Sequence, residues 1–86
     1  MTRLGIKKVL EQMNALERLM AKYNDRSDAA YQEGKIEKSY YLNHRADLAE
    51  HEIKGIMFTL RTLGLSAWKT RDGEWVVPDD DITRAI

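Results

Sequence analysis

The sequence predicts a mainly α-helical protein with a small β-hairpin, in which an antiparallel hairpin of two long helices, bridged by a short helix, precedes a C-terminal two-stranded β-hairpin. Three observations predict this fold class. Apolar residues recur at alternating steps of three and four in two long segments, the spacing of one helical face. Turn-forming residues separate these segments, and an Asp72-Gly73 pair near the C-terminus is a strong hairpin signal. At 86 residues the chain has the length of one small domain, which we expect to span residues 1–86.

The first long helix is predicted over residues 2–23. Thr2 has a side chain typical of a helix N-cap. The apolar residues form a heptad-spaced line, and Leu10 and Leu19 beside it widen the line toward the core face of a globular helix. The line consists of Ile6, Val9, Met13, Leu16, Met20 and Tyr23.

A structured connection is expected between the two long helices. Residues 24–28, with the sequence NDRSD, are turn and cap formers. Residues 28–33 are predicted to form the short bridging helix, capped by Asp28 and ended by Gly34 in the left-handed conformation.

The second long helix is predicted over residues 37–63, with Gly64 after its end. Its core stripe consists of Leu42, Ala46, Ala49, Ile53, Ile56, Leu60 and Leu63. Both alanines lie in the N-terminal half of the helix. In an antiparallel pair, large residues from the far end of the first helix, such as Met20 and Tyr23, would fill the space over them.

The C-terminal β-hairpin is predicted over residues 66–78, with Asp72-Gly73 as a two-residue type I′ turn. This register places Trp68 opposite Val77 and Thr70 opposite Trp75, so that these four side chains share one face. A lone two-stranded hairpin is only marginally stable in water. We therefore expect the tryptophan face to pack on the helices.

The last segment, residues 79–86, is expected to be an acidic tail. Pro78 ends the second strand, and three aspartates follow it. Asp81 has a side chain that can cap a short helical turn, and a frayed terminus is the alternative.

The second long helix carries a further stripe, about 160° around its axis from the core stripe. Its members also follow steps of three and four: Tyr41, His44, Leu48, His51, Gly55 and Phe58. A helix that buries only one face should be polar here. A mid-helix glycine, which costs roughly 1 kcal/mol relative to alanine, is easier to explain if something approaches the helix closely.

Three interpretations of this second stripe are open. The tryptophan hairpin folds back over Phe58 and Gly55, or the stripe binds a partner protein or a second copy of the chain. A metal site formed by His44, Asp47 and His51 is the third and least favoured interpretation. The histidines are seven residues apart, about 10.5 Å along the axis, too far to share one ion from the same helix.

Composition and motifs weigh against several other function classes. The chain contains no cysteine, and its 14 basic residues balance its 14 acidic residues, so thiolate chemistry is absent and a strong basic footprint for nucleic acid is missing. Without a phosphate-binding loop, a nucleophile motif or a convergent polar cluster, we expect no enzyme activity, cofactor, metal or small-molecule substrate. The absence of a long apolar run and of cysteine leads us to expect no membrane association and a cytoplasmic location.

The function expected from these observations is that of a small non-enzymatic protein–protein interaction module. The expected binding residues are Tyr41, His44, Leu48, His51 and Phe58 on the helix and Trp68 and Trp75 on the hairpin. By association with compact cysteine-free chains of phages and mobile elements, we expect an accessory protein or an inhibitor of this origin, such as an anti-CRISPR protein.

The alternative function is that of a small DNA-binding regulator. Helices followed by a β-hairpin have the outline of a winged helix, in which Lys69 and Arg71 on the hairpin would contact phosphate. This alternative requires the long second helix to break near Gly55, because about 27 residues is too long for an ordinary recognition helix.

Overall fold

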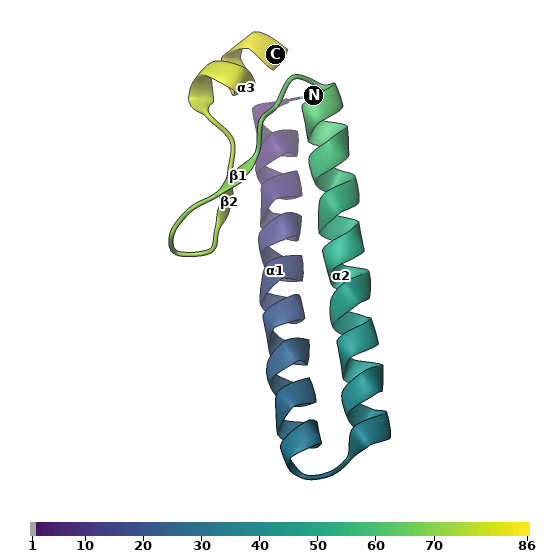
Figure 1. The fold of residues 1–86 in the computed structure, drawn as a ribbon. Coiled ribbons are helices and arrows are strands. Elements are labelled where there is room, and N and C mark those ends of the chain that lie inside the picture. The colour runs from purple at the N-terminus through teal and green to yellow at the C-terminus, as the bar shows by residue number, and fades with distance from the viewer. Residues whose placement is uncertain (1) are drawn as a thin grey trace.

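The computed structural model describes residues 2–86 and consists mainly of two long antiparallel helices packed side by side. Helix α1 spans Arg3–Gln32 and helix α2 spans Ile36–Thr62. Strands β1 (Trp68–Lys69) and β2 (Trp75–Val76) form an antiparallel hairpin, and the short helix α3 (Asp79–Ala85) ends the chain. Figure 1 shows an elongated molecule in which the hairpin and α3 lie at the end of the helical pair opposite the α1–α2 connection. The predicted fold class is therefore confirmed.

Helix α1 is longer than predicted and contains the segment expected to form the bridge. Residues 24–28 are helical, and the predicted short helix is the last part of α1. The reason is that the heptad line continues through Ser27 and Ala30, both of which are buried. Burial of these two positions against α2 outweighs the weak turn preference of the surrounding polar residues.

The predicted end of this segment is correct. Gly34 has a φ of 77°, and the Lys35 backbone N–H donates to the Ala30 carbonyl oxygen at 2.8 Å. This is the hydrogen-bond pattern of a helix ended by a left-handed glycine. At the other end of α1, the Thr2 hydroxyl accepts from the Gly5 N–H at 2.9 Å, as expected for an N-cap.

The core of the helical pair is the seam between the two heptad lines. On α2 the stripe begins at Ser39, one step earlier than predicted, and Ser27 of α1 hydrogen-bonds to it. Moving one heptad at a time from this layer, Met20 of α1 faces the position of Ala46, and the buried pairs Met13/Ile53 and Ile6/Leu60 follow. By this heptad count one large residue of α1, Met20, is level with a small residue of α2, Ala46, which is the size pairing that the sequence predicts. Leu63 is the exception in the stripe: it caps the end of α2 and is 46% exposed.

The β-hairpin has a different register from the predicted one. Trp68 pairs with Val76 and Lys69 with Trp75, so every pairing is displaced by one residue. The loop has three residues rather than two: the Thr70 N–H donates to the Glu74 carbonyl, the Gly73 N–H donates to the Thr70 carbonyl, and Gly73 has a φ of 88°. This loop requires positive φ at the glycine alone, whereas a type I′ turn also requires it at Asp72. A slip of one residue exchanges the faces of a strand, so the predicted face of four residues is wrong.

The hairpin and α3 close one end of the core. Val77 and Leu65 are buried with Ile6, Met13, Ile53 and Leu60, and Trp75, Ile82 and Ala85 pack against this cluster. The predicted acidic tail is thus a packed helix in which Asp81 is only 8% exposed. Its carboxylate accepts from the Ser66 N–H at 3.0 Å and from the Arg84 guanidinium at 2.5 Å, which ties α3 to the segment before β1. Across residues 2–86, none of the helices carries an apolar stretch that would let it cross a lipid bilayer.

Candidate functional site

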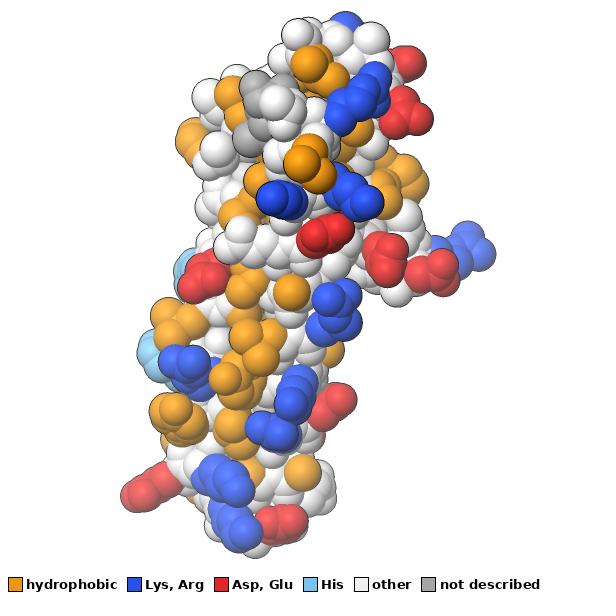
Figure 2. Space-filling view, turned by 180° about the vertical axis from the view of Figure 1, so that it is seen from behind, with side chains coloured by type: hydrophobic (Ala, Val, Ile, Leu, Met, Phe, Trp, Pro, Cys, Tyr) orange, Lys and Arg blue, Asp and Glu red, His pale blue; other side chains and the backbone are white. Residues whose placement is uncertain are grey.

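The second stripe of α2 is exposed along its whole length. Tyr41 is 61% exposed, Leu48 41% and Phe58 71%, and His44, His51 and Gly55 are exposed between them. Figure 2 shows the two histidine side chains at one edge of the molecule, with hydrophobic side chains beside them. The core stripe of the same helix faces α1, so most of the second stripe faces away from α1, and Leu48 borders the groove between the two helices. The structure thus brings five of the seven expected binding residues together on one helix.

The predicted cover over Phe58 and Gly55 is wrong. The hairpin packs on α1 through β2, and a Cβ atom built at Gly55 would meet no other atom within 4 Å. The reason is the hairpin register, which turns Trp75 toward the helices and leaves Trp68 on the opposite face, 53% exposed. Trp68 and Trp75 therefore belong to different surfaces, and neither extends the stripe of α2.

Apolar surface continues from the stripe into a shallow groove between the two helices. The groove is lined by Leu16, Leu19, Tyr23, Arg45, Leu48, Ala49 and Glu52 and has a volume of about 100 Å³. The Arg45 guanidinium lies 5.7 Å from the centre of the Tyr23 ring, within the range of a cation–π contact. Hydrophobic side chains form a broken column along the middle of the face in Figure 2. Helix α1 therefore contributes to the same apolar surface.

Charged residues flank the stripe on both sides. Arg45 and Glu52 lie on the side of the groove, whereas Asp47 and Lys54 lie on the other side of α2. All four are exposed, and Lys54 makes an exposed ion pair with Glu50 at 3.3 Å. The face has a central apolar line with both signs of charge along each edge.

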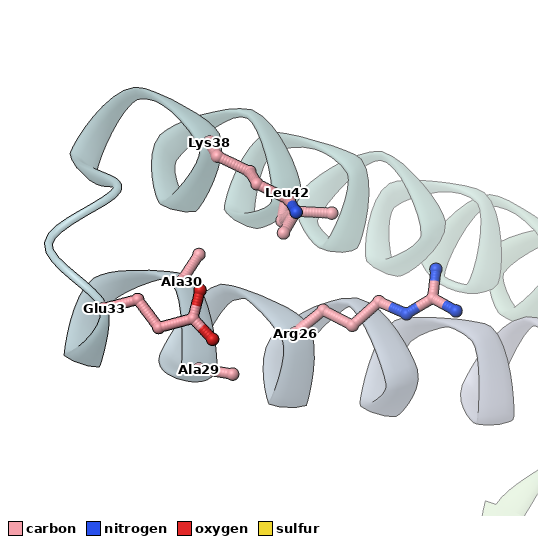
Figure 3. Close-up of a pocket in the computed structure, with 6 residues that line it drawn as sticks. All are labelled: Arg26, Ala29, Ala30, Glu33, Lys38 and Leu42. Atoms are coloured by element: carbon pink, nitrogen blue, oxygen red, sulfur yellow. The ribbon is translucent and has the colours of Figure 1, made fainter.

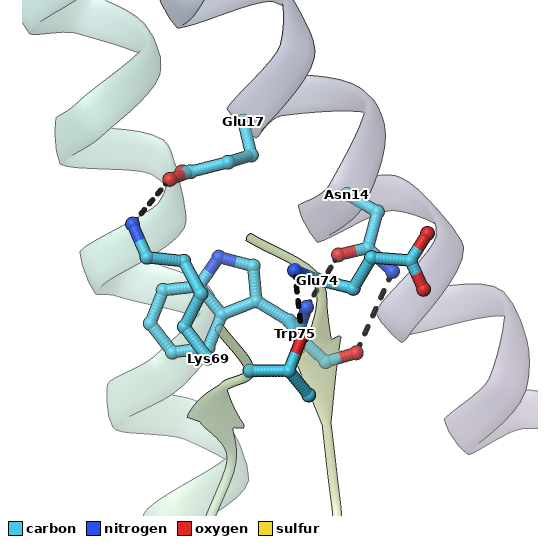
Figure 4. A network of polar contacts seen from close by, with 6 residues as sticks. Asn14, Glu17, Lys69, Glu74 and Trp75 are labelled. Atoms are coloured by element: carbon cyan, nitrogen blue, oxygen red, sulfur yellow. Dashed lines mark hydrogen bonds and ion pairs between the residues drawn. The ribbon is translucent and has the colours of Figure 1, made fainter. Parts of the chain in front are cut away.

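Lys69, a residue of the alternative DNA-binding interpretation, is engaged within the chain. Its ammonium group contacts the Glu17 carboxylate at 2.5 Å and lies 5.8 Å from the centre of the Trp75 ring. Figure 4 shows this contact beside the hydrogen bonds between Asn14 and Trp75. Arg71 is exposed in the hairpin loop. Helix α2 runs unbroken through Gly55, so the break that a recognition helix requires is absent from α2.

A hollow of about 270 Å³ lies at the opposite end of the molecule, between the end of α1 and the start of α2 (Figure 3). Ala30 points toward α2, where Leu42 lines the hollow, and Ala29 and the charged residues Arg26, Glu33 and Lys38 complete the lining. A hydrogen bond from Lys35 and its nearby positive charge hold the pKa of the Glu33 carboxyl below its usual value. The hollow forms because the residues of the seam near the α1–α2 connection, such as Ala30, are too small to fill the space between the helices. The charged side chains at its rim are exposed to solvent.

The least favoured interpretation, a metal site, gains no support. Within residues 2–86, the structure contains no group of three or more histidine, aspartate or glutamate side chains close enough to hold an ion. His44 and His51 are both exposed on α2 and lie two helical turns apart, as their seven-residue spacing requires.

Sequence reasoning missed part of the exposed apolar surface. Tyr31, Ile36 and Tyr40 near the α1–α2 connection are all exposed, and Leu19 borders the groove. Tyr40 precedes the stripe residue Tyr41 and lies at its edge, at a position equivalent to that of Asp47 one heptad later. A search of the residues flanking each stripe would have found it.

Comparisons with known proteins add nothing to this description. No protein-family model matches the chain, and neither the curated proteins nor the solved structures include a significant match.

Proposed function

We propose that the chain is a non-enzymatic protein-binding module whose binding face is the second stripe of α2 with the adjoining groove. One observation carries the proposal: Tyr41, Leu48 and Phe58 are exposed on one stripe of α2, and this stripe adjoins the apolar groove between the two helices. Exposed apolar residues are common singly, whereas a contiguous line rimmed by charges is typical of interaction sites.

The chemistry of the face supports this proposal. Aromatic side chains contribute a large contact area with few rotatable bonds, so little conformational entropy is lost on binding. The helix that presents them is held by the seam, so the backbone is already ordered before a partner arrives. Recognition would follow the helix-in-groove or helix-on-helix mode, with anchors at successive turns.

Site-specific photocrosslinking tests the proposal. A photoreactive amino acid replaces His51 on the stripe, and the same amino acid replaces the exposed Lys22 on α1 as a matched control. In cells that naturally express the chain, we expect an adduct with a polypeptide from position 51, no adduct from position 22, and loss of the adduct when Leu48→Arg is added. Equal labelling from both positions, or none from position 51, would overturn the proposed function.

A further inference from the structure

We infer that the occupant of the α2 face is a second copy of this chain, bound with the two α2 helices antiparallel. This inference rests on the proposed function and specifies its partner and geometry. The stripe has steps of three and four over 18 residues, about 25 Å of helix, which is the spacing of a coiled-coil seam. A two-fold axis would produce a layer of four helices in the order α1, α2, α2, α1.

One antiparallel register matches the sizes of the seam residues. When Tyr41 lies opposite Phe58 of the second copy, His44 lies opposite Gly55 and Leu48 lies opposite His51. The axis then passes through the centre of the stripe, and every stripe residue has a partner. Gly55 provides the room that the His44 imidazole needs, since the space around it is empty in the single chain. The mid-helix glycine thus acquires a physical reason.

The flanking charges complement one another in this same register. In an antiparallel pair, the residues along one edge of a helix meet the residues along the same edge of its partner. The residue numbers of two partners add up to 99 in the core of this register, and to 97 on one edge and 101 on the other. Arg45 then meets Glu52 of the second copy, and on the other edge Asp47 meets Lys54. The two-fold axis repeats each pair, so four opposite-charge contacts form, and Tyr40 lies beside Arg61 at both ends. No like charges meet among these edge residues.

Other arrangements of the same face bring like charges together. A parallel, in-register pair places Asp47 beside Glu52 at two symmetric sites. An antiparallel pair slipped by one heptad in one direction places Arg45 beside Arg45 and Asp47 beside Asp47. Slipped in the other direction, it places Glu52 beside Glu52 and Lys54 beside Lys54. The charge pattern therefore selects the register that the side-chain sizes also favour.

The contacts that these charged residues make within one chain leave them able to pair with the second copy. The Lys54–Glu50 pair is exposed and contributes little to stability, so Lys54 is free to contact Asp47 of the second copy. Arg45 rests on the Tyr23 ring at the border of the groove, which holds its guanidinium on the side where Glu52 of the second copy arrives. Both copies offer the same surface, as a two-fold interface requires.

Sedimentation velocity with charge-reversed variants tests the inference. At about 100 μM the wild-type chain should sediment as a dimer, with twice the 10.0 kDa chain mass, if its dissociation constant is about 10 μM or lower. Arg45→Glu and Glu52→Arg should each raise the dissociation constant at least about tenfold, because two attractions become repulsions.

An equimolar mixture of these two variants should recover the dimer. In the mixed pair, the chain with Arg45→Glu carries carboxylates at both positions 45 and 52, and the chain with Glu52→Arg carries guanidinium groups at both. Each carboxylate of one chain then meets a guanidinium of the other, so both attractions on this edge are restored.

Disulfide crosslinking tests independently whether the two α2 helices are antiparallel. The chain has no cysteine, so His44→Cys and Gly55→Cys introduce single thiols on the seam. Mixed under mild oxidation, these two variants should form a disulfide between chains, whereas neither should do so alone, because like positions lie about 16 Å apart in this register.

Three results would overturn the inference. A wild-type chain that is monomeric at about 100 μM excludes a second copy as the occupant, and the photocrosslinking at position 51 then decides separately whether another protein binds. A dimer that Glu52→Arg strengthens is parallel, because the guanidinium introduced at position 52 would lie beside Asp47. A dimer unaffected by Leu48→Arg and by both charge reversals uses another surface.

Discussion

The Ser27 hydroxyl donates a hydrogen bond to the Ser39 carbonyl oxygen at 2.9 Å across the seam between α1 and α2, and its oxygen lies 3.0 Å from the Ser39 hydroxyl. Both residues are buried at heptad positions that are otherwise apolar. A buried polar pair at one layer of a helical seam favours a single register, because any slip leaves a polar group without a partner. This pair therefore aligns the two helices near their connection.

Removing one partner of this pair should destabilise the fold. We expect Ser27→Ala to lower the free energy of unfolding by about 1 kcal/mol, since the Ser39 hydroxyl loses its partner in a buried site. The double variant Ser27→Ala/Ser39→Ala should cost less than the sum of the single variants, because no hydroxyl is left unpaired. Urea unfolding followed by far-UV circular dichroism measures all four members of the cycle. Strict additivity would show that the two hydroxyls do not interact.

The hairpin should depend on Asn14. Its Oδ1 accepts from the Trp75 N–H at 2.6 Å, and its Nδ2 donates to the Trp75 carbonyl at 3.5 Å, so one side chain ties β2 to α1. We expect Asn14→Ala to cost about 1–3 kcal/mol through the unpaired N–H, reduced by about 0.5 kcal/mol of gained helix propensity. Tryptophan fluorescence during urea unfolding reports the change. Gln12→Ala, an exposed substitution on the same helix, is the control and should change stability by less than about 0.5 kcal/mol.

Two glycine-to-alanine substitutions should have opposite signs. A Cβ at Gly73 or Gly55 would meet no atom within 4 Å, so only the backbone differs between them. Gly73 has a φ of 88°, where alanine is strained by about 1–2 kcal/mol, so Gly73→Ala should destabilise the hairpin. Gly55 is helical, so Gly55→Ala should stabilise the chain by about 0.5–1 kcal/mol. Thermal unfolding in the Leu48→Arg background measures both substitutions without a contribution from self-association. If Gly73→Ala and Gly55→Ala changed the stability in the same direction, the difference in backbone conformation would not be the cause.

The docking of α3 should weaken in acid. The Ser66 N–H and the Arg84 guanidinium both favour the ionised carboxylate of Asp81 and hold its pKa below the ordinary value. Because the folded pKa is lower than the unfolded pKa of about 3.9, this contribution is complete above about pH 5 and is lost as the pH falls through the folded pKa. Asp81→Asn should therefore unfold at a lower temperature than the wild type near pH 7, and the difference should shrink as the pH falls below the unfolded pKa of about 3.9.

The neighbouring Asp80 provides the control for this experiment. It is exposed on the same turn of α3, so Asp80→Asn keeps the change in charge but removes no hydrogen bond to Ser66. A small effect of Asp80→Asn beside a clear effect of Asp81→Asn would assign the pH dependence to the specific contact. Equal effects of both substitutions would assign it to the helix dipole instead.

The long helices and their seam were predictable because helix periodicity is a local property. Each heptad step from Ile6 to Tyr23 and from Leu42 to Leu60 reports the face that must leave water, whatever the partner is. The same logic identified the second stripe of α2 as a face with no role in the core. Its exposure follows from geometry, since a helix packed on one neighbour leaves the opposite side free.

The extension of α1 was missed because short-range preference and burial disagree there. Asn24 and Asp25 favour a turn, whereas Ser27 and Ala30 continue the apolar spacing in the form of small residues that carry a weak periodic signal. Only the presence of Ser39 across the seam makes position 27 a buried one. The contact between the helices decided the boundary.

The arrangement of the hairpin likewise depended on contacts far apart in the chain. The residues Asp72 and Gly73 specify a turn, and the structure contains one, but a two-residue and a three-residue loop both use a glycine with positive φ. The choice follows from which face can pack: with Lys69 opposite Trp75, the indole reaches the core cluster while the ammonium group reaches Glu17 and the backbone reaches Asn14.

Local sequence thus established the elements and their buried faces, since those depend on spacing along one chain segment. The strand register, the placement of both tryptophans and the open state of the α2 face depended on contacts between residues more than 50 positions apart. Only tertiary packing could select among these arrangements, because the local preferences leave them nearly equal in free energy.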